Sequence, residues 1–226
     1  MRENQSDHDK QHNRYDLHVH THYSQCAAIK PEEIAKIAIK KKLNGIAITD
    51  HDTIKGALRT KKIARKNGIN IVIGEEVSTD KGHLLAYDIQ ETIRKRELLE
   101  VLDEIRSQGG IAVIAHPFTS LRKKFLQEIP TIKNRIDGIE TFNGRIIMPQ
   151  ANAKANALAD KLKIGKTAGS DAHFLFEIGT GVTKFKGTLR EAIKQRKTII
   201  ETGSQLATPA ALALSLARKM FGNKHA

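Results

Sequence analysis

The sequence predicts an α/β fold in which a barrel-like sheet of parallel strands is surrounded by helices. Seven short runs rich in Ile, Val and Ala are typical of strands that are buried on both faces. Longer amphipathic stretches separate most of these runs, and this alternation favours parallel strands joined by right-handed crossovers. A chain of 226 residues with 39% hydrophobic residues is long enough to enclose one such core.

The strands are expected where the apolar runs are short and continuous. The predicted ranges are Tyr15–His20, Gly45–Asp50, Asn70–Gly74, His83–Tyr87, Ile111–His116, Asp137–Phe142 and Ile164–Gly169. In a barrel of parallel strands, a functional site is expected at the carboxyl ends of the strands.

Four helices are expected between these strands. The first begins at Pro31, which is followed by two acids that suit the positive end of a helix dipole, and it runs to about Lys42. The other predicted helices are Thr53–Asn67, Glu91–Ser107 and Pro149–Leu162. Glycines just beyond the first two of these are typical of helix ends.

The chain divides into three parts by composition. Residues 1–14 are polar and are expected to form a disordered leader, and residues 15–204 are expected to form a single domain. Residues 205–226 contain leucines and basic residues and are expected to form a helical tail packed on the barrel. A membrane-surface helix and an oligomer contact are the alternatives for this tail, and the sequence leaves the oligomeric state open.

Composition excludes several classes of protein. No apolar run approaches the roughly 20 residues that cross a bilayer, and the first residues lack the apolar stretch of a secretory signal. The single cysteine, Cys26, excludes an internal disulfide framework and suits a reducing compartment. We therefore expect a cytoplasmic protein with no membrane contact. The net charge of +13 fits either a phosphate-rich partner or well-solvated helix faces.

Histidines and acids recur at the predicted strand ends. His18 and His20 are two residues apart, so in a strand their side chains share one face. Further candidates lie within, at the end of or directly after the other strands: His51, Glu76, His83, His116, Asp171 and His173. Each motif alone is more typical of an ordinary core or surface residue, whereas their repetition favours one shared site.

A metal centre is the interpretation that this repetition favours. Imidazoles and carboxylates gathered at one point repel one another or lose hydration unless cations bind them. Mixed nitrogen and oxygen ligands suit Zn²⁺, Mn²⁺ or Fe. The candidates are too numerous for one tetrahedral ion, so two or three divalent metal ions are predicted.

Six short motifs carry these residues. They are Asp16-Leu-His18-Val-His20-Thr, Ile48-Thr-Asp50-His51-Asp52-Thr, Gly74-Glu-Glu76-Val-Ser, His83-Leu-Leu-Ala-Tyr, Ala115-His116-Pro117 and Gly169-Ser-Asp171-Ala-His173. In this order the set resembles the motifs of the PHP (polymerase and histidinol phosphatase) family, over about residues 15–185. The resemblance implies a distorted, TIM-like barrel of seven strands and a site of up to three metal ions that hydrolyses phosphoesters.

The resemblance also implies a role for each ligand. The expected ligands of the first ion are His18, His20, Glu76 and Asp171. Glu76 would bridge to a second ion completed by His116 and His83, and His51 and His173 would hold a third. Asp50 is expected to orient His51. Arg145 is a candidate phosphate clamp, because a guanidinium offers paired donors to phosphate; an ordinary surface arginine is the alternative.

This chain departs from the family pattern in two places. Where many relatives have an aspartate that helps to hold the third ion, this chain has Gln25, followed by Cys26. A neutral amide is a poorer ligand, and the cysteine is expected to be a small packed residue. The interval between His83 and His116 is short, whereas relatives that act on nucleotides carry a large inserted domain there. A more open mouth is therefore expected.

The predicted activity is metal-dependent hydrolysis of a phosphate ester, with a monoester favoured. The expected partner is a small phosphorylated substrate or a nucleic-acid end. A hydroxide that bridges two ions would attack phosphorus, and His83 or His173 would protonate the leaving oxygen. Two alternatives stay open: a metal-dependent amidohydrolase, and a basic nucleic-acid-associated module whose metals are structural.

Overall fold

The computed structural model describes residues 12–119, 123–203 and 209–221, and the statements below refer to these ranges. The strands are β1 (Asn13–Val19), β2 (Gly45–Ile48), β3 (Asn70–Ser78), β4 (His83–Tyr87), β5 (Ile111–Ile114), β6 (Gly138–Asn143), β7 (Gly165–Gly169), β8 (Gly181–Phe185) and β9 (Ile199–Thr202). The α-helices are α1 (Pro31–Lys40), α2 (Lys55–Ala64), α3 (Leu98–Ser107), α4 (Lys123–Ile132), α5 (Pro149–Leu162), α6 (Leu189–Lys194) and α7 (Pro209–Phe221). Two short 3₁₀ turns are η2 (Arg65–Asn67) and η3 (Leu175–Glu177).

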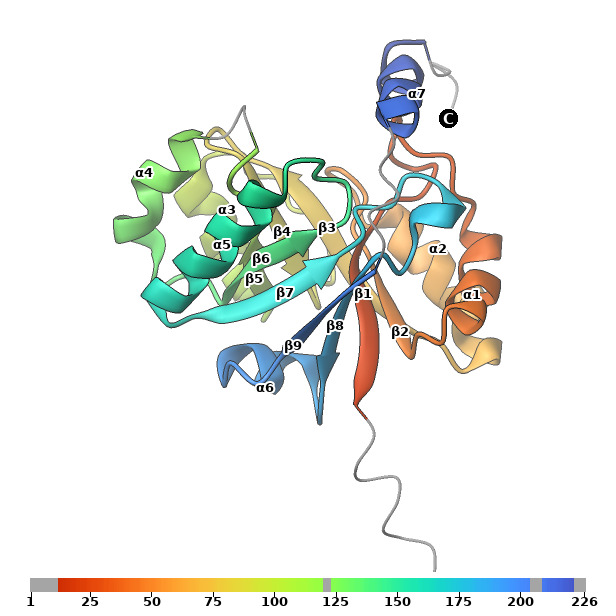
Figure 1. The fold of residues 1–226 in the computed structure, drawn as a ribbon, viewed down its shortest axis with the longest axis horizontal. Coiled ribbons are helices and arrows are strands. Elements are labelled where there is room, and N and C mark those ends of the chain that lie inside the picture. The colour runs from red at the N-terminus through yellow and green to blue at the C-terminus, as the bar shows by residue number, and fades with distance from the viewer. Residues whose placement is uncertain (1–11, 120–122, 204–208, 222–226) are drawn as a thin grey trace, which may run out of the picture.

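The strands form one sheet that curls into a nearly closed barrel, with helices outside it (Figure 1). The order across the sheet is β7-β6-β5-β4-β3-β2-β1-β8-β9. The chain that follows β7 returns to β1, where Val19 bridges to Ala172 and the Ala172 carbonyl accepts a 2.9 Å hydrogen bond from the N–H of His20. The predicted α/β barrel-like fold is confirmed, although the described residues form nine strands instead of seven.

The two additional strands are β8 and β9. Neither has a long apolar run, because β8 reads Gly-Val-Thr-Lys-Phe and β9 reads Ile-Ile-Glu-Thr. Pairing forms them: β8 runs antiparallel to β1, with Tyr15 opposite Thr183, and β9 runs antiparallel to β8. Such tertiary pairing leaves little periodic signal in a short strand.

The prediction of parallel strands throughout is wrong at β4. This strand runs antiparallel to both β3 and β5, with Ser78 opposite His83 and Leu85 opposite Val113. The connection from Ser78 to His83 is too short for a crossover, which needs a dozen or more residues, so the chain makes a hairpin. As a consequence, the start of β4 lies at the carboxyl end of β3.

The helices agree with the predictions in part. Helix α5 matches its predicted bounds, and α1 begins at Pro31 as expected. Helix α3 begins at Leu98 and not near Glu91, because the Glu97 carboxylate accepts hydrogen bonds from the N–H groups of the first turn and caps the helix. Two helices were not predicted: α4 contains Pro130 and α6 is only six residues long.

The inside of the barrel is filled by apolar side chains from neighbouring strands. Leu17, Ala47, Val72, Leu85 and Val113 belong to one buried cluster. Burying each larger side chain of this kind is worth about 1.5–3 kcal/mol. The filled interior gives the carboxyl ends of the strands a rigid floor.

The ends of the chain lie partly outside the described ranges. Asn13 and Arg14 belong to β1, so the strand begins two residues before its predicted start. Residues 1–11 of the predicted leader, and residues 205–208 and 222–226 of the predicted tail, lie outside the described residues. Between those two stretches the tail forms α7. None of the described helices has the length and apolar character needed to span a bilayer.

Candidate metal centre

His18 and His20 lie at the carboxyl end of β1 with their side chains fully buried. Their Nε2 atoms are 3.2 Å apart, so the two rings point to the same place, as the spacing in a strand predicts. The bridge from Val19 to Ala172 keeps the chain extended beyond the end of the strand.

The carboxylate of Glu76 lies at the centre of the candidate site. Its Oε2 atom lies 3.3 Å from the Nε2 atoms of both His18 and His20, and 3.1 Å from Nδ1 of His51. Its Oε1 atom lies 3.0 Å from Nε2 of His116 and also contacts Nδ1 of His83. One buried carboxylate is therefore surrounded by these imidazoles: His18, His20, His51, His83 and His116.

The hairpin between β3 and β4 explains the position of His83. This residue opens its strand, and a parallel strand would carry it to the far end of the barrel. Because β4 runs antiparallel to β3, the ring of His83 instead meets Glu76 two residues before the end of β3. Sequence reasoning therefore identified this candidate although it assumed the wrong strand direction.

Asp171 and His173 follow β7 and close the other side of the cluster. Oδ1 of Asp171 lies 3.2 Å from Nε2 of His20 and 3.6 Å from Nε2 of His18. Asp171 has a φ of 56°, a left-handed conformation that aspartate tolerates better than most residues. The Nδ1 atom of His173 lies 2.8 Å from the Asp171 carbonyl oxygen, and this contact orients the ring.

Four overlapping groups of potential ligands result, each with its donor atoms within 4.8 Å of one another. They are His18–His20–Glu76, His18–His116–Asp171, His51–Glu76–His83 and His20–His51–His173. All eight side chains predicted as ligands lie in this one cluster.

Burial and the mutual field of these groups set their protonation. Burial lowers the pKa of His51 to about 4 and holds the pKa of His173 well below its usual range, so both rings are neutral. Burial opposes ionisation of Glu76, but the surrounding imidazoles, His83 foremost, outweigh it and hold the pKa of this carboxyl well below its usual range. Neutral imidazoles and ionised carboxylates are the forms that bind metals.

The donor set fits divalent cations. Nδ1 of His51 is buried and has no hydrogen-bond partner among the described residues, although Glu76 Oε2 lies only 3.1 Å away. A cation between the two atoms would satisfy both. Imidazole nitrogens mixed with carboxylate oxygens suit zinc, manganese or iron better than magnesium.

Comparison with known proteins identifies the family. A model of the PHP domain matches residues 16–162, and a PHP-associated model matches residues 149–198. The chain belongs to the PHP domain family. This confirms the family that the sequence motifs resemble.

Three relatives match different lengths of this PHP-domain chain. An uncharacterized protein of Methanocaldococcus jannaschii is 35% identical over 139 residues, covering 57% of this chain and 80% of the relative. A second uncharacterized protein of that organism is 32% identical over 179 residues, covering 76% of this chain and 70% of the relative. A 5′-3′ exoribonuclease of Haemophilus influenzae is 28% identical over 113 residues, covering 42% and 41%.

Solved structures share the PHP fold at low identity. A protein of Bifidobacterium adolescentis assigned as a metal-dependent phosphoesterase has a TM-score of 0.60 at 17% identity, covering 90% of this chain and 96% of that one. An amidohydrolase of Chromobacterium violaceum with bound sulfate has a TM-score of 0.64 at 17% identity, covering 87% and 99%. Similarity at this identity supports the fold alone.

Glu140 on β6 orients two of the candidate ligands and was not among the predicted site residues. Its Oε1 lies 2.9 Å from Nδ1 of His18, and its Oε2 accepts hydrogen bonds from the His116 N–H (2.9 Å) and from Asn143 Nδ2 (3.1 Å). The sequence holds one signal for this role: an acid within a run predicted as a buried strand needs a partner.

Asp50 acts mainly on the loop after β1. Its carboxylate accepts hydrogen bonds of 2.7 Å from the Thr21 N–H, the Thr21 hydroxyl and the Ser24 hydroxyl. The Ser24 Oγ lies 3.3 Å from Nδ1 of His20 and accepts a 2.9 Å bond from the N–H of His51. Asp50 is thus linked to His51 through the Ser24 hydroxyl, which accepts the bond from the backbone N–H of His51. The Ser24 hydroxyl also contacts the ring of His20.

The residues that depart from the family pattern lie in the same loop. Gln25 is exposed, while Cys26 is buried and belongs to none of the four ligand groups found in the described residues. The buried position of Cys26 fits the packing role predicted for it.

Arg145 lies beside the cluster in an ion pair. Its Nη1 donates to both carboxylate oxygens of Glu177, at 2.7 and 3.0 Å, and its Nη2 donates to Oγ of Ser215 on α7, at 3.1 Å. Glu177 also accepts a 2.7 Å bond from the N–H of His173. The geometry therefore favours a role in holding the His173 loop over the predicted phosphate clamp.

Proposed function

We propose that this PHP protein is a metal-dependent phosphoesterase that hydrolyses a phosphate monoester. The observation that carries the proposal is the sharing of the Glu76 carboxylate among the imidazoles around it, with Asp171 beside them. A shared carboxylate holds two cations close together, and paired cations suit an in-line displacement at phosphorus.

The eight clustered side chains would hold two or three ions of manganese, zinc or iron. His18, His20, Glu76 and Asp171 would hold the first, Glu76 with His83 and His116 the second, and His51 with His173 the third. When bound, such cations lower the pKa of a water molecule towards neutrality and neutralise charge on the phosphoryl oxygens.

The exposure of the histidines indicates the side from which a substrate reaches the cluster. The side chains of His18 and His20 are fully buried, whereas those of His51 and His83 are 30% and 19% exposed. The substrate therefore reaches the cluster from the side of His51 and His83. His18 and His20, which are fully buried, would hold the ions in place and exclude water on the side of the cluster that faces the barrel interior.

His83 is the better placed of the two predicted proton donors. Its ring contacts Glu76 through Nδ1, and its side chain is about twice as exposed as that of His173, 19% against 9%. The Nδ1 of His173 is already held by the Asp171 carbonyl. We assign protonation of the leaving oxygen to His83 where this ring is not itself a metal ligand, while Arg145 and Glu177 keep the loop that carries His173 in position.

An amidohydrolase is the second candidate, because the same fold occurs in the Chromobacterium violaceum amidohydrolase. Metal-stripped protein, reloaded with Mn²⁺, Zn²⁺ or Fe²⁺, should be assayed on an aryl phosphate, an aryl phosphodiester, a dipeptide and a 5′-phosphorylated RNA oligonucleotide. We include the RNA because of the similarity to an exoribonuclease.

Release of phosphate from the monoester, but no cleavage of the dipeptide, is the expected result. Glu76→Gln should remove the activity, whereas Glu100→Gln, an exposed Glu-to-Gln change on α3, should keep it. Cleavage of the dipeptide alone would favour the amidohydrolase. Normal metal content with turnover of none of the substrates would favour the binding module.

A further inference from the structure

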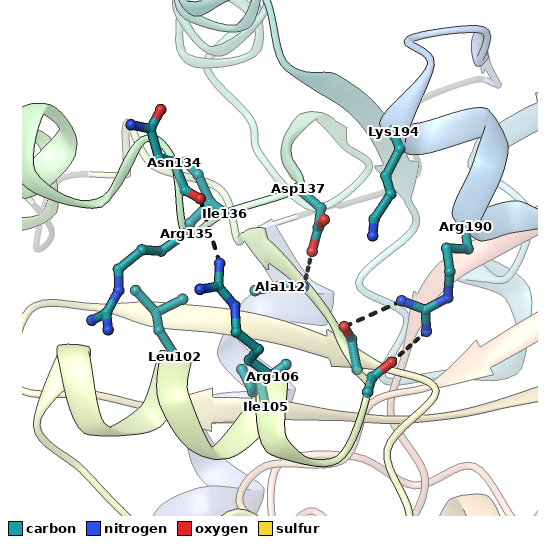
Figure 2. A pocket seen from close by; sticks show the side chains of 12 residues that line it. Leu102, Ile105, Arg106, Ala112, Asn134, Arg135, Ile136, Asp137, Arg190 and Lys194 are labelled. Carbon is teal, nitrogen blue, oxygen red and sulfur yellow. Dashed lines mark hydrogen bonds between the residues drawn. The ribbon is translucent and has the colours of Figure 1, made fainter.

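A second concave site lies at the amino end of β5, whereas His116 lies beyond its carboxyl end. The pocket has a volume of about 210 Å³ and lies between α3, the Gly109–Gly110 turn, the segment before β6 and α6 (Figure 2). From Gly110 to His116 the strand and its ends span about 20 Å at ~3.3 Å per residue. This pocket is therefore separate from the metal cluster.

Basic side chains surround this pocket. Arg106, Arg135, Arg190 and Lys194 line it, and Asp137 is the acid that lines it. In Figure 2, Arg190 and Lys194 reach in from α6, while Arg106 rises from α3 on the other side. They come from segments far apart in the sequence, so the fold gathers them.

Two of the four cations have a carboxylate partner outside the pocket. Arg135 pairs with Asp103 at 2.6 Å, and Arg190 lies 3.6 Å from Asp88. Arg190 also donates to the carbonyl oxygens of Gly109 and Gly110, at 2.6 and 3.4 Å.

The other two cations have no carboxylate within ion-pair distance among the described residues. Arg106 donates only a long bond, 3.4 Å, to the carbonyl oxygen of Asn134. The side chain of Lys194 makes no hydrogen bond or ion pair within the described part of the chain, and both side chains are exposed. A carbonyl oxygen does not neutralise a guanidinium, so these two charges are available to an anion.

Apolar side chains form part of the lining of the pocket. Leu102, Ile105 and Ile136 are almost completely buried beneath the cations. Asp137 opposes an anion, but the four basic side chains that line the pocket outnumber its single negative charge.

We propose that this pocket binds a phosphate group, with Arg106 and Lys194 as the cations that hold it. Pockets that enclose a whole drug-sized ligand measure about 300–1,000 Å³, so one of about 210 Å³ takes the phosphate and leaves the rest of the ligand outside. The phosphate belongs either to a small phosphorylated molecule or to a nucleic-acid backbone. The alternative is that Arg106 and Lys194 only complement the C-terminal ends of α3 and α6.

The test uses the double variant Arg106→Gln/Lys194→Gln. The matched control is Lys36→Gln/Lys40→Gln on α1, which removes two exposed charges from a helix that does not line the pocket. Inorganic phosphate is titrated at constant ionic strength while the amide NMR signals of Gly109 and Gly110 are followed. These local signals separate the pocket from any phosphate bound at the metal cluster.

We expect saturable shifts in the wild type and the control, and a dissociation constant at least tenfold larger in the pocket variant. Equal binding by the pocket variant, or the same shifts with chloride as with phosphate, would overturn the proposal. A nucleoside 5′-monophosphate and an oligonucleotide without terminal phosphates then distinguish the two sources. If the backbone is the ligand, loss of two phosphate contacts should lower the salt slope of single-strand binding by about 1.4.

Neither result depends on the proposed hydrolysis, because the readout lies at the opposite end of β5 from the metal cluster. A phosphoesterase that fails this test keeps its activity, and a positive test does not require activity.

Discussion

Replacing Glu140 with glutamine should weaken metal binding although Glu140 belongs to none of the four candidate ligand groups among the described residues. The carboxylate accepts bonds from the His116 N–H and Asn143 Nδ2 on one oxygen, and meets Nδ1 of His18 on the other. A glutamine has only one oxygen. That oxygen stays with the two N–H donors, since the amide nitrogen would clash with both, so the amide NH₂ faces His18.

The substitution changes the tautomer of His18. With a donor opposite, Nδ1 must give up its proton and act as an acceptor, so the proton moves to Nε2. Nε2 is the atom that faces Glu76 at 3.3 Å and Asp171 at 3.6 Å, where a cation would lie. Changes to such supporting partners typically cost 10- to 100-fold in metal affinity, which is about 1.4–2.7 kcal/mol.

The assay is competition with a chromophoric chelator for Zn²⁺ or Mn²⁺, on protein whose thermal unfolding is measured in parallel. Glu100→Gln on α3 is the matched control, because that side chain is 55% exposed and lies 3.6 Å from Lys95. An unchanged dissociation constant in a folded Glu140→Gln protein would refute the tautomer argument. Long-range ¹⁵N NMR of the His18 ring gives an independent reading of the proton position.

Three further predictions follow from single contacts. Glu76→Gln should abolish hydrolysis and lower the bound metal measured by elemental analysis, and an active variant would contradict the assignment of the central ligand. Gly169→Ala should destabilise the fold by about 1–3 kcal/mol in urea unfolding, because the new Cβ would lie 2.3 Å from Cβ of His18; an unchanged midpoint would count against this close contact. Glu177→Ala should cost about 3–5 kcal/mol, since it leaves the buried Arg145 without its carboxylate, and a loss below 1 kcal/mol would show that water replaces the pair.

The sequence predicted that the candidate ligands come together, because they follow a rule of position. Residues at the ends of neighbouring strands meet whatever the loops between them do, so His18, His51, His116 and Asp171 needed no knowledge of side-chain contacts. His83 lies at the same end of the barrel for a different reason, because its strand, β4, runs antiparallel to β3. Predictions from strand ends therefore tolerate an error in strand direction when the candidate lies at the opposite end of a hairpin strand.

The sequence did not predict the hydrogen bonds and ion pairs that position these candidate ligands, because they join residues that are distant along the chain. Glu177 reaches Arg145, which lies 32 positions earlier, and Asp16 accepts a 2.9 Å bond from the N–H of Ser170, 154 positions away. No periodicity encodes such pairs. The strands β8 and β9 were missed for the same reason, since pairing and not their own composition forms them: β8 pairs with β1, and β9 pairs with β8.

These supporting contacts share one feature, a buried carboxylate that accepts a backbone N–H, and this feature affects which ligands the site can bind. Four buried carboxylates each accept a backbone N–H from a loop that carries ligands: Asp16 from Ser170, Asp50 from Thr21, Glu140 from His116 and Glu177 from His173. With Glu76 and Asp171 they make the mouth negative; Arg145 offsets part of that charge, as do His18 and His20, whose pKa values these carboxylates raise against the effect of burial. A phosphate is repelled there until cations are bound. Chelation should therefore abolish phosphate binding at the mouth and leave binding between Arg106 and Lys194 intact.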